Sequence, residues 1–270
     1  MQCETIEVNV SNAIALVTLN RPKKANSLNA LMWQEIKAAL NWCDQTAEVR
    51  AVVINGAGRN FCAGIDLMML AEIQTSLTSE CEARNRETIR ALILNLQSSV
   101  SSLEHCRKPV IAAIHGACVG GGLDLVLAAD FRYASTDASF SVHEVAMGLV
   151  ADVGSLQRLG RIVGEGTARE MTFTAMDMPA NDALSVRLVN QVFVSPEECL
   201  AAAMRTASVI AAQSPLAVRG SKQVLNYSRD HSVSDGLEYV ATWNGGMLLS
   251  ADIKEAITAQ MSGRAAQYLD

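Results

Sequence analysis

Short apolar runs alternate with helix-like stretches through the first half of this chain, and that alternation constrains the fold more than any other feature. Segments with the pattern of strands lie at residues 4–10, 13–20, 49–55, 110–115 and 130–134. The stretches between them predict helices at residues 29–45, from about 67, at 79–106 and at 120–128. We therefore expect an α/β protein in which helices cover a sheet and ligands bind at the carboxyl ends of the strands.

From about Pro196 the pattern changes to consecutive, mostly amphipathic helices with no convincing strand. Helices are predicted at residues 196–213, 215–230, 233–249 and 252–262. We accordingly divide the chain into a core, residues 1–195, and a helical C-terminal region, residues 196–270. Such a region usually packs on its own body or on a neighbouring subunit.

The composition excludes several classes of protein. Half of the 270 residues are hydrophobic and 19% are charged, which is the balance of a folded chain. A formal net charge of −6 is the wrong sign for binding along nucleic acid phosphates. The seven cysteines are scattered without a CxxC pair, which predicts free thiols and neither a zinc site nor a disulfide framework.

Common address and membrane signals are not found in the sequence. The first residues lack the basic and apolar regions of a signal peptide, and the last four do not form a peroxisomal or prenylation motif. The longest apolar stretch, residues 109–129, is interrupted by His115, Asp124 and four glycines, so it is no membrane span. We expect a cytoplasmic protein with no membrane partner.

Familiar cofactor and nucleophile motifs fail on inspection. The sequence Gly56-Ala57-Gly58 lacks the third glycine of a dinucleotide fingerprint, because Phe61 stands there. Gly154-Ser155 forms no G-x-S-x-G elbow. The four histidines have no metal-ligand spacing, so we expect no metal. Hydride transfer, serine hydrolysis and metal-assisted hydrolysis therefore lose their support.

Two turns rich in small residues remain, at residues 61–67 and 115–125. In each, small residues allow backbone N–H groups to approach a ligand closely, and a helix begins just after. One N–H group from each turn, converging on one point, would form an oxyanion hole. The alternative is that Gly120-Gly121-Gly122 only permits tight packing.

Three acids, Asp124, Glu144 and Asp152, lie within apolar or small-residue stretches. Acids in such surroundings are often partly buried, which shifts their pKa values. Each also has a structural explanation. Asp124 falls in a first helical turn, Asp152 could cap the helix that continues through Leu159, and Glu144 could be an exposed charge on a loop.

These motifs resemble the crotonase (enoyl-CoA hydratase/isomerase) superfamily along almost the whole chain, from Leu19-Asn20-Arg21-Pro22 through both turns to the C-terminal helices. The segments 120–124 and 144–159 are most similar to its Δ3,5-Δ2,4-dienoyl-CoA isomerase branch. Residues 227–233 and 239–244 resemble the C-terminal region of the same branch.

The resemblance implies a spiral of ββα units with a helical C-terminal trimerisation region, assembled as a homotrimer or as a homohexamer made of two trimers. It implies an acyl-CoA thioester as substrate and no separate cofactor, because coenzyme A is part of that substrate. The thioester oxygen would lie between the N–H groups of Ile65 and Gly121. The substrate groove would be lined by Lys24, Ala25, Asn26, Ala63, Gly64, Ile65, Asp66, Leu67 and Gly121.

The resemblance also implies a reaction, the 1,5 proton shift from a 3,5-dienoyl to a 2,4-dienoyl thioester in the β-oxidation of unsaturated fatty acids. Its hydratases carry two glutamates and a small residue where this chain has Asp124, Glu144 and Asp152, whereas its dienoyl isomerases match all three. On this hypothesis Glu144 removes the C2 proton, Asp152 protonates C6, and Asp124 orients and tunes Glu144. The assignment of acids to the two carbons stays open.

Two rival functions are weighed against this one. An enoyl-CoA hydratase or a Δ3-Δ2-enoyl-CoA isomerase would share the fold, and Asp152 is the residue that discriminates. A few crotonase-like proteins bind RNA through a lysine-rich helix, but the matching helix here carries only Lys37 as a basic residue.

Overall fold

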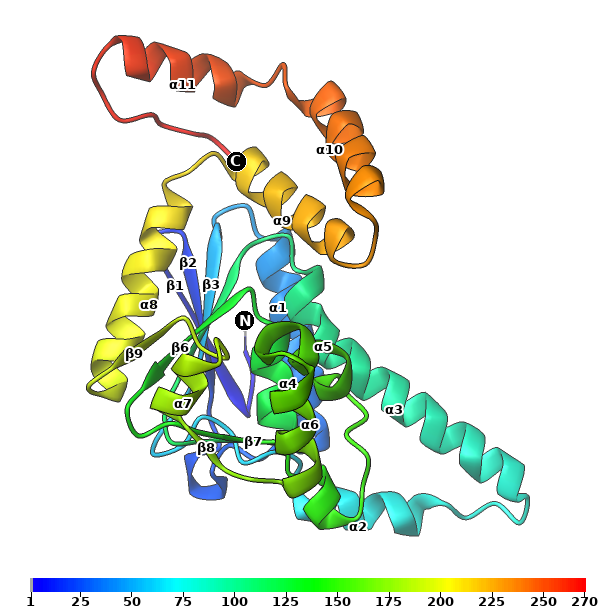
Figure 1. Cartoon of the computed structure of the whole chain (residues 1–270). Coiled ribbons are helices and arrows are strands. Elements are labelled where there is room, and N and C mark those ends of the chain that lie inside the picture. Colours follow the sequence, from blue (N-terminus) through cyan, green and yellow to red (C-terminus); the bar gives the residue numbers. More distant parts are fainter. Residues whose placement is uncertain (1) are drawn as a thin grey trace.

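The computed structural model describes residues 2–270 and consists of two β-sheets surrounded by helices (Figure 1). The larger sheet has the order β1-β2-β3-β4-β6-β9, and the smaller has the order β5-β7-β8. The strands of the two sheets are β1 (Ile6–Ser11), β2 (Ile14–Leu19), β3 (Ala51–Gly56), β4 (Val110–Ile114), β5 (Ala117–Val119), β6 (Phe131–Ser135), β7 (Ser139–Ser141), β8 (Met178–Pro179) and β9 (Gln191–Phe193). The α-helices of the described residues are α1 (Ala30–Gln45), α2 (Leu67–Ser76), α3 (Glu82–His105), α4 (Gly121–Ala128), α5 (Ser155–Val163), α6 (Glu165–Thr174), α7 (Ala180–Ser185), α8 (Pro196–Ala211), α9 (Pro215–Arg229), α10 (Val233–Met247) and α11 (Ala251–Met261).

The two sheets are built by repetition of one unit. A strand of the larger sheet is followed by a strand of the smaller sheet and then by a helix, as in β4-β5-α4 and in β6-β7 before α5. The strands of the larger sheet run parallel except for β1, which pairs antiparallel with β2. The expected spiral of ββα units is therefore confirmed.

Local sequence signals place the helix starts. Asn29 accepts a hydrogen bond from the N–H of Met32 and so caps α1, as expected. In the C-terminal region each helix begins at a serine whose hydroxyl caps it, and these serines are Ser195, Ser214, Ser232 and Ser250. The four helices predicted there agree with the structure within two residues at each end.

The smaller sheet was not predicted from the sequence. Its strands are two or three residues long, so they carry no readable alternation. They pair only because the larger sheet brings their ends together. β5 pairs with β7, and the extended residue Cys62 bridges to Cys118 at the other side of β5.

Helix α8 packs directly on the larger sheet. Its small buried residues recur at four-residue spacing, at Cys199, Ala203, Ala207 and Ala211, and meet Val53 and Ile111 of the sheet among others. The division after residue 195 stays a prediction. In packing terms α8 covers the core, while α9, α10 and α11 lie beyond the end of the sheet (Figure 1).

Helix α9 is fastened to the core by a buried lysine. Lys222 is 5% exposed, and its ammonium donates to the carbonyls of Leu103 and Lys108 and to the carboxylate of Asp130, 2.7 Å away. Asp130 also accepts from the N–H of Val110 at the start of β4. None of the described helices is both long and apolar enough to cross a membrane.

We expect Lys222→Met to lower the free energy of unfolding by about 3 kcal/mol, because it leaves Asp130 and two carbonyls without their cation. Urea denaturation followed by circular dichroism measures this. Lys254→Met is the matched control, since Lys254 is exposed on α11 and should change stability little. An equal, small effect of both substitutions would contradict the fastening role of Lys222.

Candidate active site

The two small-residue turns of the sequence meet in the structure. The N–H of Cys62 donates to the carbonyl of Ala117, and the N–H of Val119 donates to the carbonyl of Cys62, both at 2.9 Å. The turn that begins at residue 61 therefore lies along β5, directly before the start of α4. A methyl group on Gly64 would stand 2.9 Å from the carbonyl oxygen of Val119 and 3.6 Å from the nitrogen of Gly121.

Two backbone N–H groups are left available where the turns meet. Ile65 pairs with Leu28 through the groups on either side of it, the carbonyl of Gly64 and the N–H of Asp66. The N–H of Ile65 itself therefore points away from Leu28. Gly121 is the first residue of α4, so its N–H has no carbonyl partner within the helix.

Two glycines of the triplet, Gly120 and Gly122, are required by close contacts. Gly120 has φ of +52°, and a methyl group there would stand 2.9 Å from Oε1 of Glu144. A methyl group on Gly122 would stand 2.7 Å from the carbonyl oxygen of Cys62. The packing interpretation of the triplet is thus correct, and the same packing brings Glu144 against the turn.

Asp124 is completely buried in the first turn of α4. Neither of its carboxylate oxygens has a hydrogen-bond partner among the described residues. Burial raises its pKa to about 7, with a contribution in the same direction from Glu144 that is opposed by the neighbouring Ser155 and Arg158. Asp124 therefore does lie in a first helical turn, as the structural explanation expects. The helix dipole alone does not account for a buried carboxylate that has no hydrogen-bond partner among the described residues.

Glu144 begins the 3-10 helix η2 (Glu144–Met147) and is half-buried. Burial raises the pKa of its carboxyl group, as does the charge of Asp152. Its Oε2 is buried without a hydrogen-bond partner in the described part of the chain. The interpretation of Glu144 as an exposed loop charge is wrong, and Glu144 interacts electrostatically with both of the other acids.

Asp152 lies in the loop before α5. The cap of that helix is Gly154, with no side-chain hydrogen bond, so the alternative in which Asp152 caps it is wrong. Asp152 lines a cavity of about 1050 Å³ that also contacts Gln97 and Arg158. It is accessible to solvent, yet the surrounding protein still raises the pKa of its carboxyl group.

The residues expected to line the substrate groove form one rim beside the turns. The N–H of Ala63 donates to the carbonyl of Ala25 at 3.0 Å, next to the exposed Lys24. Leu67, at the start of α2, is 63% exposed. Asp66 has a structural role there, because it caps α2 and forms an ion pair with Arg21 at 2.9 Å.

Two residues of this region have a structural role that the sequence did not indicate, although Asn26 was expected to line the groove. The buried side chain of Asn26 accepts from the N–H of Arg21 and donates to the carbonyls of Ala57, Asn60 and Phe61, so it holds the first turn in place. Arg158 of α5 reaches towards Asp124. Neither contact has a local sequence signal, because the partners are distant along the chain. In the described residues, no group of three or more His, Cys, Asp or Glu side chains could hold a metal ion.

The chain was compared with protein families, with characterised relatives and with solved structures. Residues 9–270 match the enoyl-CoA hydratase/isomerase family model. The peroxisomal Delta(3,5)-Delta(2,4)-dienoyl-CoA isomerase of Arabidopsis thaliana is 44% identical over 98% of this chain and 96% of its own. The mitochondrial enzyme of the same name from Mus musculus is 45% identical over 97% of this chain and 80% of its own. The crystal structure of an enoyl-CoA hydratase from Bacillus anthracis superimposes with a TM-score of 0.89 at 30% identity, covering 98% of this chain and 99% of the other.

These relatives confirm the resemblance and correct one expectation. The expected cytoplasmic location is wrong, because the similar proteins are peroxisomal or mitochondrial. The expectation rested on missing terminal motifs, and receptors read such addresses from a few residues that need not fit a simple pattern.

We expect Asp124→Asn to be more stable than the parent at pH 8 by a few kcal/mol. The raised pKa of Asp124 means that the folded state holds a proton that the unfolded state releases, so its stabilising contribution is complete below about pH 4 and lost by about pH 7. The gap between variant and parent should therefore widen from pH 5 to pH 8. Urea denaturation at both pH values measures it, and a gap that does not depend on pH would show that Asp124 ionises normally.

Proposed function

Because the chain belongs to the enoyl-CoA hydratase/isomerase family, we propose that it converts a 3,5-dienoyl-CoA into the 2,4-dienoyl-CoA by moving a proton from C2 to C6. The observation that carries this proposal is the set of three acids. Asp124, Glu144 and Asp152 all have raised pKa values, and Glu144 interacts with both others beside the paired turns.

The first step requires stabilisation of negative charge on the thioester oxygen. The protons on C2 are acidic because they lie between a carbonyl and a double bond, and their removal leaves a conjugated dienolate. The N–H groups of Ile65 and Gly121 would bind its oxygen, and donors of this kind contribute about 3 kcal/mol each. The N-terminus of α4 adds its positive end to the same point.

The proton itself needs one group at each end of the diene. Glu144 lies against Gly120 at the turn, which suits a base acting at C2 next to the thioester. Asp152 is exposed to solvent and its charge acts on Glu144, which suits an acid acting at C6. When Asp124 is ionised, its negative charge would raise the pKa of the neighbouring Glu144, so Asp124 would tune Glu144. The groove rim of Lys24, Ala25 and Ala63 to Leu67 would hold the coenzyme A portion.

The reaction as proposed needs no cofactor and no metal. One proton leaves carbon and another returns, so no oxidation state changes. An enoyl-CoA hydratase is the alternative on this fold, supported by the structural likeness to the Bacillus anthracis enzyme. The raised pKa of Asp152 favours the isomerase, because water addition across one double bond does not require a third acid.

We also propose that the protein assembles as a homotrimer or as a homohexamer of two trimers. Large apolar side chains are exposed on and between the last helices, among them Val233, Leu237, Leu249 and Met261. Sedimentation velocity should give three or six times the mass of the chain, and Leu237→Asp should reduce the assembled fraction. Val194→Asp is the matched control, exposed but outside these helices. A monomeric parent protein would contradict this proposal.

The function is tested by mixing the purified protein with a 3,5-dienoyl-CoA and following the near-ultraviolet absorbance of the conjugated 2,4-dienoyl thioester. A rapid rise is expected. Faster turnover of a simple 2-enoyl-CoA than of any dienoyl substrate would favour the hydratase instead.

In the same assay Asp152→Asn should lower kcat by about 10²–10⁴-fold, because it removes the group that returns the proton. Asp177→Asn, an exposed acid outside the site, is the control and should leave the rate unchanged. Near-normal turnover of the Asp152 variant would remove the role assigned to this residue.

A further inference from the structure

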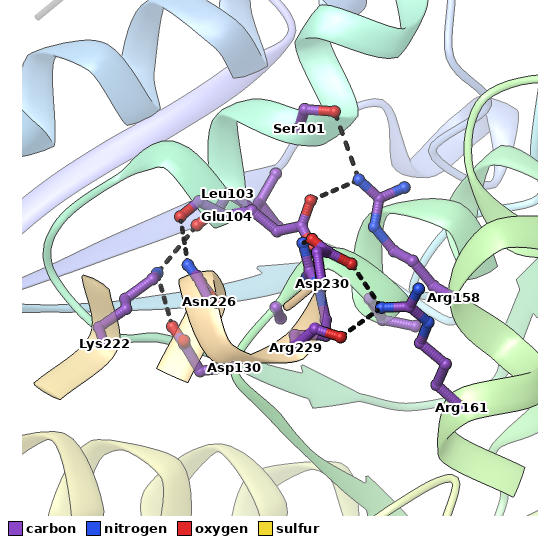
Figure 2. Close-up of polar contacts among 12 residues, drawn as sticks. Ser101, Leu103, Glu104, Asp130, Arg158, Arg161, Lys222, Asn226, Arg229 and Asp230 are labelled. Carbon is purple, nitrogen blue, oxygen red and sulfur yellow. Dashed lines mark hydrogen bonds and ion pairs between the residues drawn. The ribbon is translucent and has the colours of Figure 1, made fainter. Parts of the chain in front are cut away.

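The side chain of Arg158 connects the acids of the site to a polar cluster behind them. Figure 2 shows its guanidinium reaching from α5 to Ser101 and Glu104 on α3. Nη2 of Arg158 lies 2.6 Å from Oε2 of Glu104 and 3.3 Å from Oγ of Ser101. Both charged side chains are about 85% buried, with 15% and 14% exposed.

The other side of the same guanidinium faces Asp124. A methyl group on Gly154 would stand 1.8 Å from Nη1 of Arg158 and 3.8 Å from Oδ1 of Asp124, so both groups adjoin the same small space. Gly154 keeps this space open. The two do not form a direct ion pair in the structure, and the Nε atom of Arg158 is buried without a hydrogen bond in the described chain.

A second arginine fixes the partner of Arg158. Arg229, at the end of α9, pairs with the other oxygen of Glu104 and also with Asp230. Asp230 in turn pairs with Arg161, one turn beyond Arg158 on α5, at 2.6 Å (Figure 2). Ion pairs thus lead from α5 through α3 to the end of α9 and back.

We propose that Arg158 is a positioning residue, held by Glu104, whose positive charge offsets the negative charge that builds up on Asp124 and its neighbouring acids during the proton shift. The proposal rests on the function proposed above. It assigns to the site a cation that touches no substrate and acts through Asp124.

The charges around Asp124 make this role specific. Glu144 faces it from η2, Ser155 and Arg158 from α5, and the thiol of Cys118 from β5, while Asp152 faces Glu144. Arg158 is the basic group that acts on Asp124, and His143 is the basic group that acts on Glu144. Burial and Glu144 raise the pKa of Asp124, and Arg158 opposes them. Asp124 therefore stays near the range in which it can share a proton with Glu144 at neutral pH.

A purely structural strut between α3 and α5 would use the same ion pair, so the test must separate charge from attachment. Arg158→Gln removes the cation and the attachment together. Glu104→Gln weakens the attachment but keeps the cation and frees it from its own counter-charge. If the charge of Arg158 matters, Glu104→Gln should lower the pKa of Asp124. If Arg158 is only a structural strut, Glu104→Gln should shift this pKa upwards, as Arg158→Gln does. Arg158→Lys keeps the charge, and Arg161→Gln removes a cation of the same helix that does not face Asp124.

The primary readout is the titration of Asp124 itself, by carbon-13 NMR of protein labelled at aspartate carboxyl groups and assigned with Asp124→Asn. We expect Arg158→Gln to raise the pKa of Asp124 by about one pH unit or more. Arg158→Lys should keep the pKa of Asp124 close to that of the parent, Glu104→Gln should lower it, and Arg161→Gln should have no effect. The pH dependence of kcat/KM for the dienoyl substrate should move in the same directions.

Identical titrations of the parent and Arg158→Gln would overturn the proposal, as would equal upward shifts in Arg158→Gln and Glu104→Gln. If the parent turned over no dienoyl-CoA, the proposed function would fail, but the NMR titration would still decide whether Arg158 sets the charge of Asp124.

Discussion

The close approach of two backbone turns is the constraint on which the rest of the site depends. No side chain fits between Gly122 and the carbonyl of Cys62, or between Gly64 and the carbonyl of Val119. Because these contacts join backbone to backbone, they fix the directions of the N–H groups of Ile65 and Gly121 more firmly than side-chain packing could. The same triplet lets Glu144 lie against Gly120. A backbone contact thus positions both the available donors and the central acid.

The second constraint is electrostatic, because three acids share a partly buried space. Among the described residues the carboxylate of Asp124 has no hydrogen-bond partner, and its pKa is raised to about 7 by burial first and by the charge of Glu144 as well. An unpaired carboxylate in such a place opposes folding, and natural chains keep one only where a neighbour or a function offsets that cost. Arg158 is the neighbour, and it is itself held by Glu104.

The sequence predicts the elements of this fold well where the signal is local. Asn29 marks the start of α1, and five of the six strands of the larger sheet and the four C-terminal helices follow from the sequence pattern. The smaller sheet escapes prediction because its strands are too short to show a period. The three acids stand out in the sequence by their apolar surroundings, but their roles could be assigned only through a family resemblance, since Asp152 fits a helix cap equally well on paper. Arg158 escapes because its partners lie on other elements, which only the folded chain brings together.

The polar cluster also changes how the C-terminal helices should be understood. On sequence grounds they form an appendage, yet Arg229 of α9 fixes Glu104, and Glu104 fixes the cation that faces Asp124. Lys222 anchors the same helix to Asp130 at the start of β6. Any displacement of α9 therefore acts on the C-terminal end of α3, where Leu103 and Glu104 lie. The electrostatic role that we propose for Arg158 therefore extends to the C-terminal helices, even though none of these α9 residues is one of the three acids.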